Sequence, residues 1–318
     1  MSTAKVRRAE VIPACWILLG ILSHTAWGGY PVLARYIQTV GRVPPLAMTG
    51  IANGIATLGL FLVAMPRLKG TLPVARDLAF FGIVVVARSL SNVLAARFTA
   101  AIHVQLLSLM TPFFTALLSR PILGERLPRF TLPAVFLSIL GSVLMVTSTG
   151  KSGGIAFHLD GQDWLGLGLA LASAFLLSFY MITIRKVVRK DTSVETLGAF
   201  QTIVLLVCMT TGSLALGEDW GSLARLPAKG WIAILVYGLC VILAGTLIQN
   251  SALKRIPASV YTVMLSWRLV STSFFAFLIL GEKFTSQWQI LGALLVMVTV
   301  TLYSGFQRSP APSSIGQS

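Results

Sequence analysis

The sequence predicts an all-α integral membrane protein, in which ten transmembrane helices form two inverted repeats of five helices. Three observations carry this prediction: long apolar blocks, a sparse and one-sided distribution of charge, and an internal repeat. The chain has 318 residues, of which 55% are hydrophobic and 11% are charged, and its mean hydropathy is +0.83. A soluble domain carries about 25% charged residues, so the composition excludes a soluble fold.

The apolar blocks predict the individual spans. A helix needs about 20 residues, at 1.5 Å each, to cross a hydrocarbon core about 30 Å thick. The first block is too long for a cleaved signal peptide, so we interpret it as a span. The tail at 307–318 is rich in Pro and Ser and is predicted to be disordered and cytoplasmic. The predicted spans are 11–34, 45–65, 77–96, 100–120, 130–149, 163–185, 195–216, 230–252, 258–281 and 286–306.

The basic residues predict the orientation in the membrane. The formal net charge is +15, but the charges form short clusters between apolar blocks, which argues against nucleic acid and for a lipid bilayer. Of the 25 Lys and Arg residues, 16 fall on one side of the predicted spans and 7 on the other, while Arg88 and Arg268 lie within spans. Cytoplasmic loops are enriched in Lys and Arg, so both termini are predicted to be cytoplasmic at a bacterial-type inner membrane.

The cysteines give no sign of a disulfide framework or a metal site. Cys15, Cys208 and Cys240 all lie in apolar segments without a CxxC spacing, and we expect them to be small buried side chains. The sequence also lacks HExxH, GxSxG, P-loop and Asp-rich diphosphate motifs. No cofactor, no metal and no enzyme activity are therefore expected.

The chain contains an internal repeat. "LGERL" (123–127) returns as "LGEKF" (280–284) at an offset of 157 residues, and "ARSLSNVLAARF" (87–98) lies over "AGTLIQNSALKR" (244–255) at the same offset. At an offset of 150, "YPVLAR" (30–35) lies over "YMITIR" (180–185). These matches predict a first five-helix repeat in residues 1–150 and a second in residues 151–306.

An odd number of spans makes the second repeat enter the membrane from the opposite side. Inverted repeats of this kind are typical of secondary transporters, which bind their solute near the midplane between the two halves. Duplicated channels and membrane enzymes also exist, so the repeat alone leaves these alternatives open.

The motifs resemble those of the drug/metabolite transporter superfamily, in its EamA-type branch. The similarity lies in the small-residue-rich "SHTAWGGYPVLAR", in Gly124-Glu125-Arg126 and Gly281-Glu282-Lys283 at the ends of the two fourth helices, and in Pro112. The resemblance implies ten spans in two repeats and covers the chain to about residue 306. The sequence departs from the family pattern in the ninth span, where a frequent Glu-Pro is Arg268-Leu269.

Two arginines in the middle of spans are the leading candidates for a solute site. Arginine at a helix centre costs about 2.5–3.5 kcal/mol on insertion scales, so Arg88 and Arg268 are expected to face protein or a water-filled cavity. Asn92 lies one turn beyond Arg88 on the same helical face. The alternative is structural: each guanidinium binds backbone carbonyls and side chains of its neighbours.

The remaining candidates are aromatic and polar residues in or near spans. The aromatic residues offer flat walls with one polar edge, and Trp267 beside Arg268 is the favoured pair for a carboxylate joined to an apolar body. Packing, helix–helix hydrogen bonding and structural histidines remain the alternatives for this group. Its members are Trp27, Tyr30, Tyr180, Trp267, Gln249, Asn250, His24 and His103. By contrast, Gly50 and Gly54 are expected to pack helices, and Glu125 and Glu282 to be structural.

These residues predict a transporter, with export the expectation that the resemblance implies, of a small anionic or zwitterionic metabolite such as an amino acid. All ten acidic residues fall in loops or at span ends. Cation exporters depend on a carboxylate within the membrane, so a proton-coupled multidrug exporter is the disfavoured alternative. A membrane scaffold or a lipid-handling enzyme is a second alternative. The sequence does not predict an oligomeric state.

Overall fold

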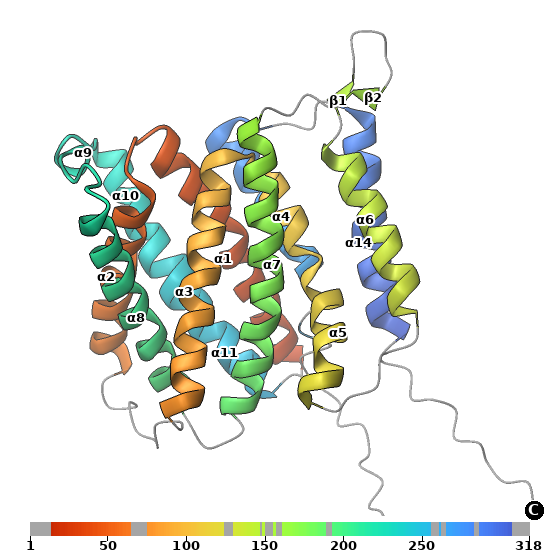
Figure 1. The fold of residues 1–318 in the computed structure, drawn as a ribbon, viewed down its shortest axis with the longest axis horizontal. Coiled ribbons are helices and arrows are strands. Elements are labelled where there is room, and N and C mark those ends of the chain that lie inside the picture. Colours follow the sequence, from red (N-terminus) through yellow and green to blue (C-terminus); the bar gives the residue numbers. More distant parts are fainter. Residues whose placement is uncertain are drawn as a thin grey trace, which may run out of the picture.

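The structure is a computed structural model that describes residues 14–64, 75–123, 130–146, 148–149, 155–156, 161–188, 193–255, 261, 265–282 and 286–306. The predicted tail at 307–318 and the motif Gly124-Glu125-Arg126 lie outside these residues. The described chain is almost entirely helical (Figure 1).

The first repeat supplies the helices of spans one to five. They are α1 (Ala14–Thr39), α2 (Pro45–Ala64), α3 (Ala75–Phe98), α4 (Ala101–Ser108) followed by α5 (Thr111–Leu123), and α6 (Thr131–Val146). Two short antiparallel strands, β1 (Ser148–Thr149) and β2 (Ile155–Ala156), follow α6 and lie at the top of Figure 1.

The second repeat supplies the helices of spans six to ten. They are α7 (Gly161–Val188), α8 (Val194–Ala215), α10 (Ala228–Val236) continued by η2 (Tyr237–Ala244) and α11 (Gly245–Arg255), α13 (Leu265–Phe275) continued by η3 (Ala276–Leu280), and α14 (Gln287–Phe306). The η segments are π-helical, and a short helix, α9 (Gly221–Ala224), connects α8 to α10.

The described helices follow the predicted spans to within a few residues at most ends. Within the described part of the chain, five helices are long and apolar enough to cross a membrane, and the apolar stretches Ala101–Thr115, Trp267–Leu280 and Gln287–Thr299 are shorter. The fourth span was predicted as one helix and is instead divided into α4 and α5 at Leu109 and Met110. Pro112 explains the division, since it has no N–H to donate to the carbonyl of Ser108.

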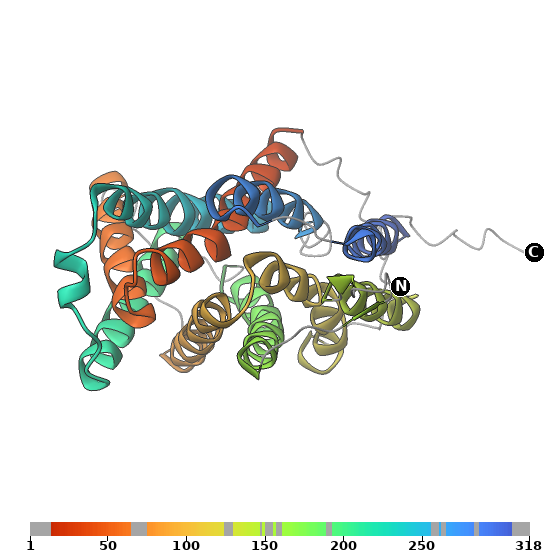
Figure 2. The ribbon, with the colours of Figure 1, turned by 90° about the horizontal axis from the view of Figure 1, so that it is seen from above.

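The helices of the two repeats pack reciprocally. The first helix of each repeat packs on the third and fourth spans of the other: α1 contacts α11, η2 and α13, while α7 contacts α3, α4 and α5. The second helices, α2 and α8, pack together, and so do the fifth helices, α6 and α14, which form a pair at one end of the molecule in Figures 1 and 2. Such reciprocal contacts are expected when the two repeats arrange their five spans in the same order.

Contacts at the helix ends fix the direction of the second repeat. Arg35, near the end of α1, forms an ion pair with Glu282 at the end of η3. The end of span one therefore lies beside the end of span nine. This is the arrangement of alternating crossings, in which the fourth helix of the second repeat runs the same way as the first helix of the first repeat.

The membrane setting explains which side chains lie on the outer surface and which positions allow helices to pack closely. Large apolar side chains are exposed on the outer surface of the bundle, as expected for contact with lipid. Cys15, Cys208 and Cys240 are also exposed, so our expectation that they are buried was wrong: a small apolar side chain suits a lipid-facing position equally well. Gly50 packs helices as predicted, because a Cβ there would lie 2.6 Å from Thr210 Oγ1 on α8.

Candidate solute-binding site

The two arginines that lie within spans meet at one polar cavity between the repeats. This cavity, which we call the arginine chamber, leaves about 10 Å³ for the centres of water molecules, which is room for about one water. Its walls come from α1, α3, α4, α7 and α13, so both repeats contribute. The lining residues are Trp27, Tyr30, Pro31, Arg88, Asn92, Gln105, Ser108, Ser173, Leu177 and Arg268.

Arg88 is held between aromatic rings. Its guanidinium carbon lies 5.3 Å from the centre of the Trp27 ring and 5.1 Å from that of the Tyr180 ring, distances at which cation–π attraction operates. Arg88 is only 8% exposed, and its Nε has no hydrogen-bond partner among the described residues. A buried donor without a partner is costly, so a ligand oxygen at this position is favourable.

Arg268 approaches the same space from the second repeat. Its guanidinium lies 5.7 Å from the Trp27 ring, and its Nη2 donates to Nδ1 of His24 at 3.2 Å. Because an arginine can only donate, His24 accepts this bond at Nδ1. Its Nε2 then donates to the carbonyl of Tyr261 at 3.1 Å, so the imidazole ring is neutral. The Nε of Arg268 is unpartnered among the described residues.

No described carboxylate neutralises either arginine. The ion pairs found among the described residues are Arg35 with Glu282 and Arg225 with Asp219, both at the ends of the bundle. Besides the two arginines, Gln105 also has an unpartnered donor, its Nε2, and its side chain is 3% exposed and lines the arginine chamber. The chamber therefore gathers donors and positive charge, which suits a carboxylate.

A second cavity adjoins the first. It leaves about 20 Å³ for the centres of water molecules, and we call it the amide chamber. It shares Trp27, Tyr30, Arg88 and Asn92 with the arginine chamber, so Arg88 and Asn92 stand between the two. The additional lining residues are Asn53, Val85, Ser89, Gln201, Leu205, Tyr237 and Ile242.

The predicted site residues divide into two groups. Arg88, Asn92, Arg268, Trp27 and Tyr30 line the chambers together. Tyr180 lies behind them, packed against Arg88 and donating its hydroxyl to Gln201 Oε1 at 2.9 Å.

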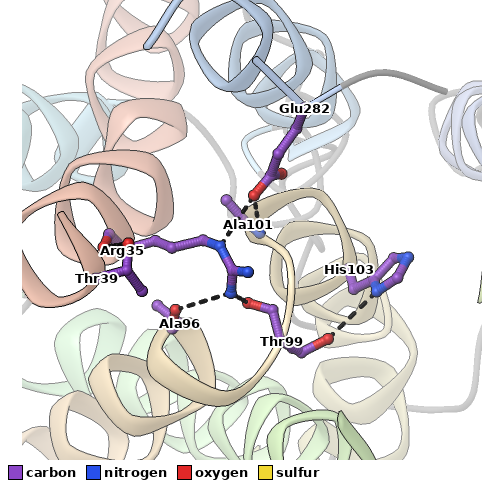
Figure 3. A network of polar contacts seen from close by, with 7 residues as sticks. All are labelled: Arg35, Thr39, Ala96, Thr99, Ala101, His103 and Glu282. Atoms are coloured by element: carbon purple, nitrogen blue, oxygen red, sulfur yellow. Dashed lines mark hydrogen bonds and ion pairs between the residues drawn. The ribbon is translucent and has the colours of Figure 1, made fainter. Parts of the chain in front are cut away.

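Three further predicted residues lie neither on the chamber walls nor against Arg88. Trp267 is 45% exposed and donates to Thr25 Oγ1 at 2.9 Å, so it does not share a face with Arg268. Gln249 is buried away from both chambers. His103 contacts Thr99 Oγ1 at 3.3 Å near the end of the bundle (Figure 3).

Sequence reasoning missed several polar residues on the walls. Gln105, Asn53 and Gln201 all lie inside predicted spans, as Asn92 does, and all three are buried. The signal was present in the sequence, since an amide in the middle of an apolar span needs a partner or a ligand as much as an arginine does. Searching all spans for amides would have found them.

Comparisons with known proteins agree with this architecture. The model of the EamA-like transporter family matches residues 14–147 and again residues 164–305. The chain is similar to "Uncharacterized transporter YyaM" of Bacillus subtilis (strain 168), with 23% identity over 222 residues, or 70% of each chain. One crystal structure matches 93% of this chain and 99% of its own with a TM-score of 0.67, and at 16% identity this likeness concerns the fold alone.

The chain belongs to the EamA-like transporter family, within the drug/metabolite transporter superfamily. This confirms the predicted family and the ten-helix membrane fold in two repeats, and it makes the protein a membrane transporter. Membership in a transporter family also argues against an enzyme. The boundaries predicted for the repeats, 1–150 and 151–306, remain a prediction.

Proposed function

We propose that this protein is a secondary transporter of the bacterial inner membrane that exports a small carboxylate-bearing metabolite, such as an amino acid. The observation that carries the proposal is the arginine chamber. Two buried guanidinium groups, one from each repeat, face one cavity with an unpartnered Nε on each. Fixed positive charge at this depth repels cations and attracts an anionic group.

The arrangement suggests how the solute would bind. The guanidinium of Arg88 lies over the rings of Trp27 and Tyr180, and its Nε is left without a hydrogen-bond partner among the described residues. A carboxylate between Arg88 and Arg268 accepts from both Nε groups, and Gln105 supplies a further donor. Because the two arginines belong to different repeats, a bound carboxylate would hold the repeats together at the midplane.

The cycle that follows from this site is alternating access. One repeat rocks against the other around the bound solute, so the chambers open first to the cytoplasm and then to the other side. The orientation, with both termini in the cytoplasm, rests on the bias of 16 to 7 basic residues. Export rests on the family resemblance.

The alternatives have less support. A proton-coupled multidrug exporter needs a carboxylate within the membrane, and none lies on the walls of either chamber. His24 is a poor proton carrier, because both ring nitrogens are engaged and Nδ1 accepts from an arginine. We therefore propose downhill or exchange transport. A scaffold or a lipid-handling enzyme would leave the two facing guanidinium groups without a role.

Uptake into liposomes that contain the purified protein tests the proposal. The panel consists of radiolabelled amino acids, short monocarboxylates and the lipophilic cation tetraphenylphosphonium, each with and without an imposed pH gradient. We expect flux of carboxylates, none of the cation, and exchange when the inside is loaded with unlabelled solute. Flux of the cation that follows the pH gradient would favour the multidrug alternative, and no flux of any solute would favour a scaffold.

A further inference from the structure

The amide chamber carries a hydrogen-bond acceptor that the arginine chamber lacks. Among the described residues, both chambers share the unpartnered donors of Trp27 and Arg88 and the unpartnered acceptor of Asn92. The arginine chamber alone adds the donors of Arg268 and Gln105, while the amide chamber alone adds the unpartnered acceptor of Asn53, a residue that is 1% exposed. The orientation of this amide is settled by its other end, since Nδ2 donates to the carbonyl of Thr49 at 2.8 Å. Oδ1 is therefore the atom left without a partner.

Aromatic rings line the same chamber. The rings of Trp27 and Tyr30 lie 5.8 Å apart, and those of Tyr30 and Tyr237 lie 5.2 Å apart, so they form a continuous wall. The Trp27 ring already lies against the guanidinium of Arg88, but the rings of Tyr30 and Tyr237 carry no such contact among the described residues of this chamber. An amide oxygen beside these two rings suits a cationic group that donates hydrogen bonds. No described acidic side chain lines the amide chamber, so the positive charge would be balanced within the solute itself.

We propose that Asn53 accepts a hydrogen bond from an ammonium group of the solute while Arg88 and Arg268 bind its carboxylate. This inference rests on the proposed function and narrows the solute from carboxylates in general to amino-acid-like zwitterions. Arg268 lines the arginine chamber alone and Asn53 lines the amide chamber alone, so a solute that spans both meets a second guanidinium at one end and the amide acceptor at the other.

Matched sets of probes test this proposal on the purified full-length protein. One set is leucine, 4-methylpentanoate, which lacks the amino group, and 3-methylbutylamine, which lacks the carboxylate; the other set is alanine, propanoate and ethylamine. Affinities are measured by calorimetry for the wild type, for Asn53→Leu, which has similar volume and no acceptor, and for Asn53→Thr, which keeps an oxygen.

We expect leucine or alanine to bind at least tenfold more tightly than its deaminated partner. Asn53→Leu should abolish that difference while the affinity for the deaminated acid changes less than twofold, and Asn53→Thr should retain part of it. Equal binding of amino acids and deaminated acids, unchanged by Asn53→Leu, overturns this inference and leaves the proposed function standing. If no carboxylate in either set binds, the proposed function and the inference fail together.

An independent observation concerns the end of the bundle, where charged residues join the two repeats (Figure 3). Arg35 on α1 bonds Glu282 Oε1 through its Nε at 3.1 Å, and its Nη1 donates to the carbonyls of Ala96, at 3.5 Å, and Thr99. Those carbonyls belong to the end of α3, where a cation is favoured by the helix dipole and by acceptors that the helix itself leaves free.

Glu282 completes the arrangement from the second repeat. Gly281, with φ of +66°, ends η3 in the left-handed conformation and turns the chain towards the first repeat. The Glu282 carboxylate then accepts from the backbone N–H of Ala101 at 3.4 Å, at the start of α4, where an anion is favoured. Arg35 thus caps the end of α3, and Glu282 caps the start of α4. Both helices belong to the first repeat, and the ion pair joins that repeat to the second.

A second carboxylate acts in the same way at this face. Glu218, just after α8, accepts from the backbone N–H groups of Leu46 at 3.3 Å and Ala47 at 2.8 Å, at the start of α2. The cavity walls come from the same α1, α3, α4 and α13 that meet near Arg35 and Glu282. Solute can leave towards this face only if those elements separate.

We infer that the Arg35–Glu282 pair is a latch that keeps this face of the transporter closed and must break for the chambers to open towards it. Ser108 lines the arginine chamber and reports that opening when it is replaced by cysteine in a cysteine-free background. The rate of its modification by a membrane-impermeant thiosulfonate, added from this face in whole cells, measures access without requiring a known solute.

Glu282→Gln should raise the modification rate at least tenfold, and Arg35→Gln, which removes the other partner of the ion pair, should raise it comparably. Arg225→Gln is the matched control, because Arg225 pairs with Asp219 at 2.6 Å within one loop and does not join the repeats. An unchanged rate in Glu282→Gln overturns the latch. So does an equal rise in the control. If Glu282→Gln does not fold, Glu282→Asp, which shortens the side chain, gives the same comparison.

Discussion

Arg268→Ala is the most direct perturbation of the proposed site. Arg268 is 3% exposed, and its Nε is free to bind solute while Nη2 is engaged by His24. A hydrogen bond to a charged group contributes about 1.5–3 kcal/mol. At about 1.4 kcal/mol per tenfold change, the affinity for a bound carboxylate should fall roughly 10- to 150-fold.

Calorimetry on purified Arg268→Ala, with the best-bound carboxylate of the transport panel, measures this loss. Arg268→Lys keeps the charge but loses the planar fork, and should recover only part of the affinity. Arg225→Ala removes an arginine whose side chain is 74% exposed, and should have no effect. If Arg268→Ala and Arg88→Ala both lower the melting temperature while affinity stays within twofold, the arginines are structural and our reasoning is refuted.

Three further predictions concern packing, protonation and topology. Gly50→Ala should lower the melting temperature, because its Cβ would lie 2.6 Å from Thr210 Oγ1 and overpacking costs about 1–3 kcal/mol, whereas Gly168→Ala, with open space around it, should not. Burial raises the pKa of the Glu282 carboxyl above its ordinary 4.5, against the opposing effect of Arg35, so opening of the latch releases a proton and is favoured as pH rises just above 4.5. We therefore expect the modification rate of Ser108→Cys to rise with pH over that window when it is divided by the rate in the Glu282→Gln variant. Both variants carry His103→Gln, which removes the histidine of the same polar network. Single cysteines at Arg76 and Asp219 should label from opposite sides of intact cells, and labelling of both from one side would contradict the inverted repeats.

The fold could be predicted because its determinants are local or periodic. Apolar blocks of sufficient length define spans, and the return of "LGERL" (123–127) as "LGEKF" (280–284) at an offset of 157 residues marks the repeat. The division of the fourth span was missed although Pro112 was visible, because proline is tolerated in many membrane helices when neighbouring groups satisfy the freed carbonyl.

The site could be predicted only in part. Arg88 and Arg268 could be found because an arginine within a span is costly whichever way the helix is rotated. Its presence therefore indicates a polar environment from the sequence alone. Trp267 was paired with Arg268 from adjacency, yet neighbours in a helix point about 100° apart, and only the rotation of α13 decides which of them faces the cavity. That rotation depends on packing against α1, where Gly28 allows the backbone of α13 to approach, and the sequence does not reveal which helix is the partner.

The break between α4 and α5 has no counterpart in α13, which the structure describes as one helix from Leu265 to Phe275. At the offset of 157 residues, Pro112 corresponds to Leu269, whose N–H lets α13 continue without interruption from Leu265 to Phe275. The fourth spans of the two repeats therefore differ in stiffness: the first is divided at Leu109 and Met110, and α13 in the second is a continuous helix. Bending should concentrate at Leu109 and Met110, and Arg268 should travel with α13 as part of a rigid body, so the charge moves while the walls around Gln105 and Ser108 deform.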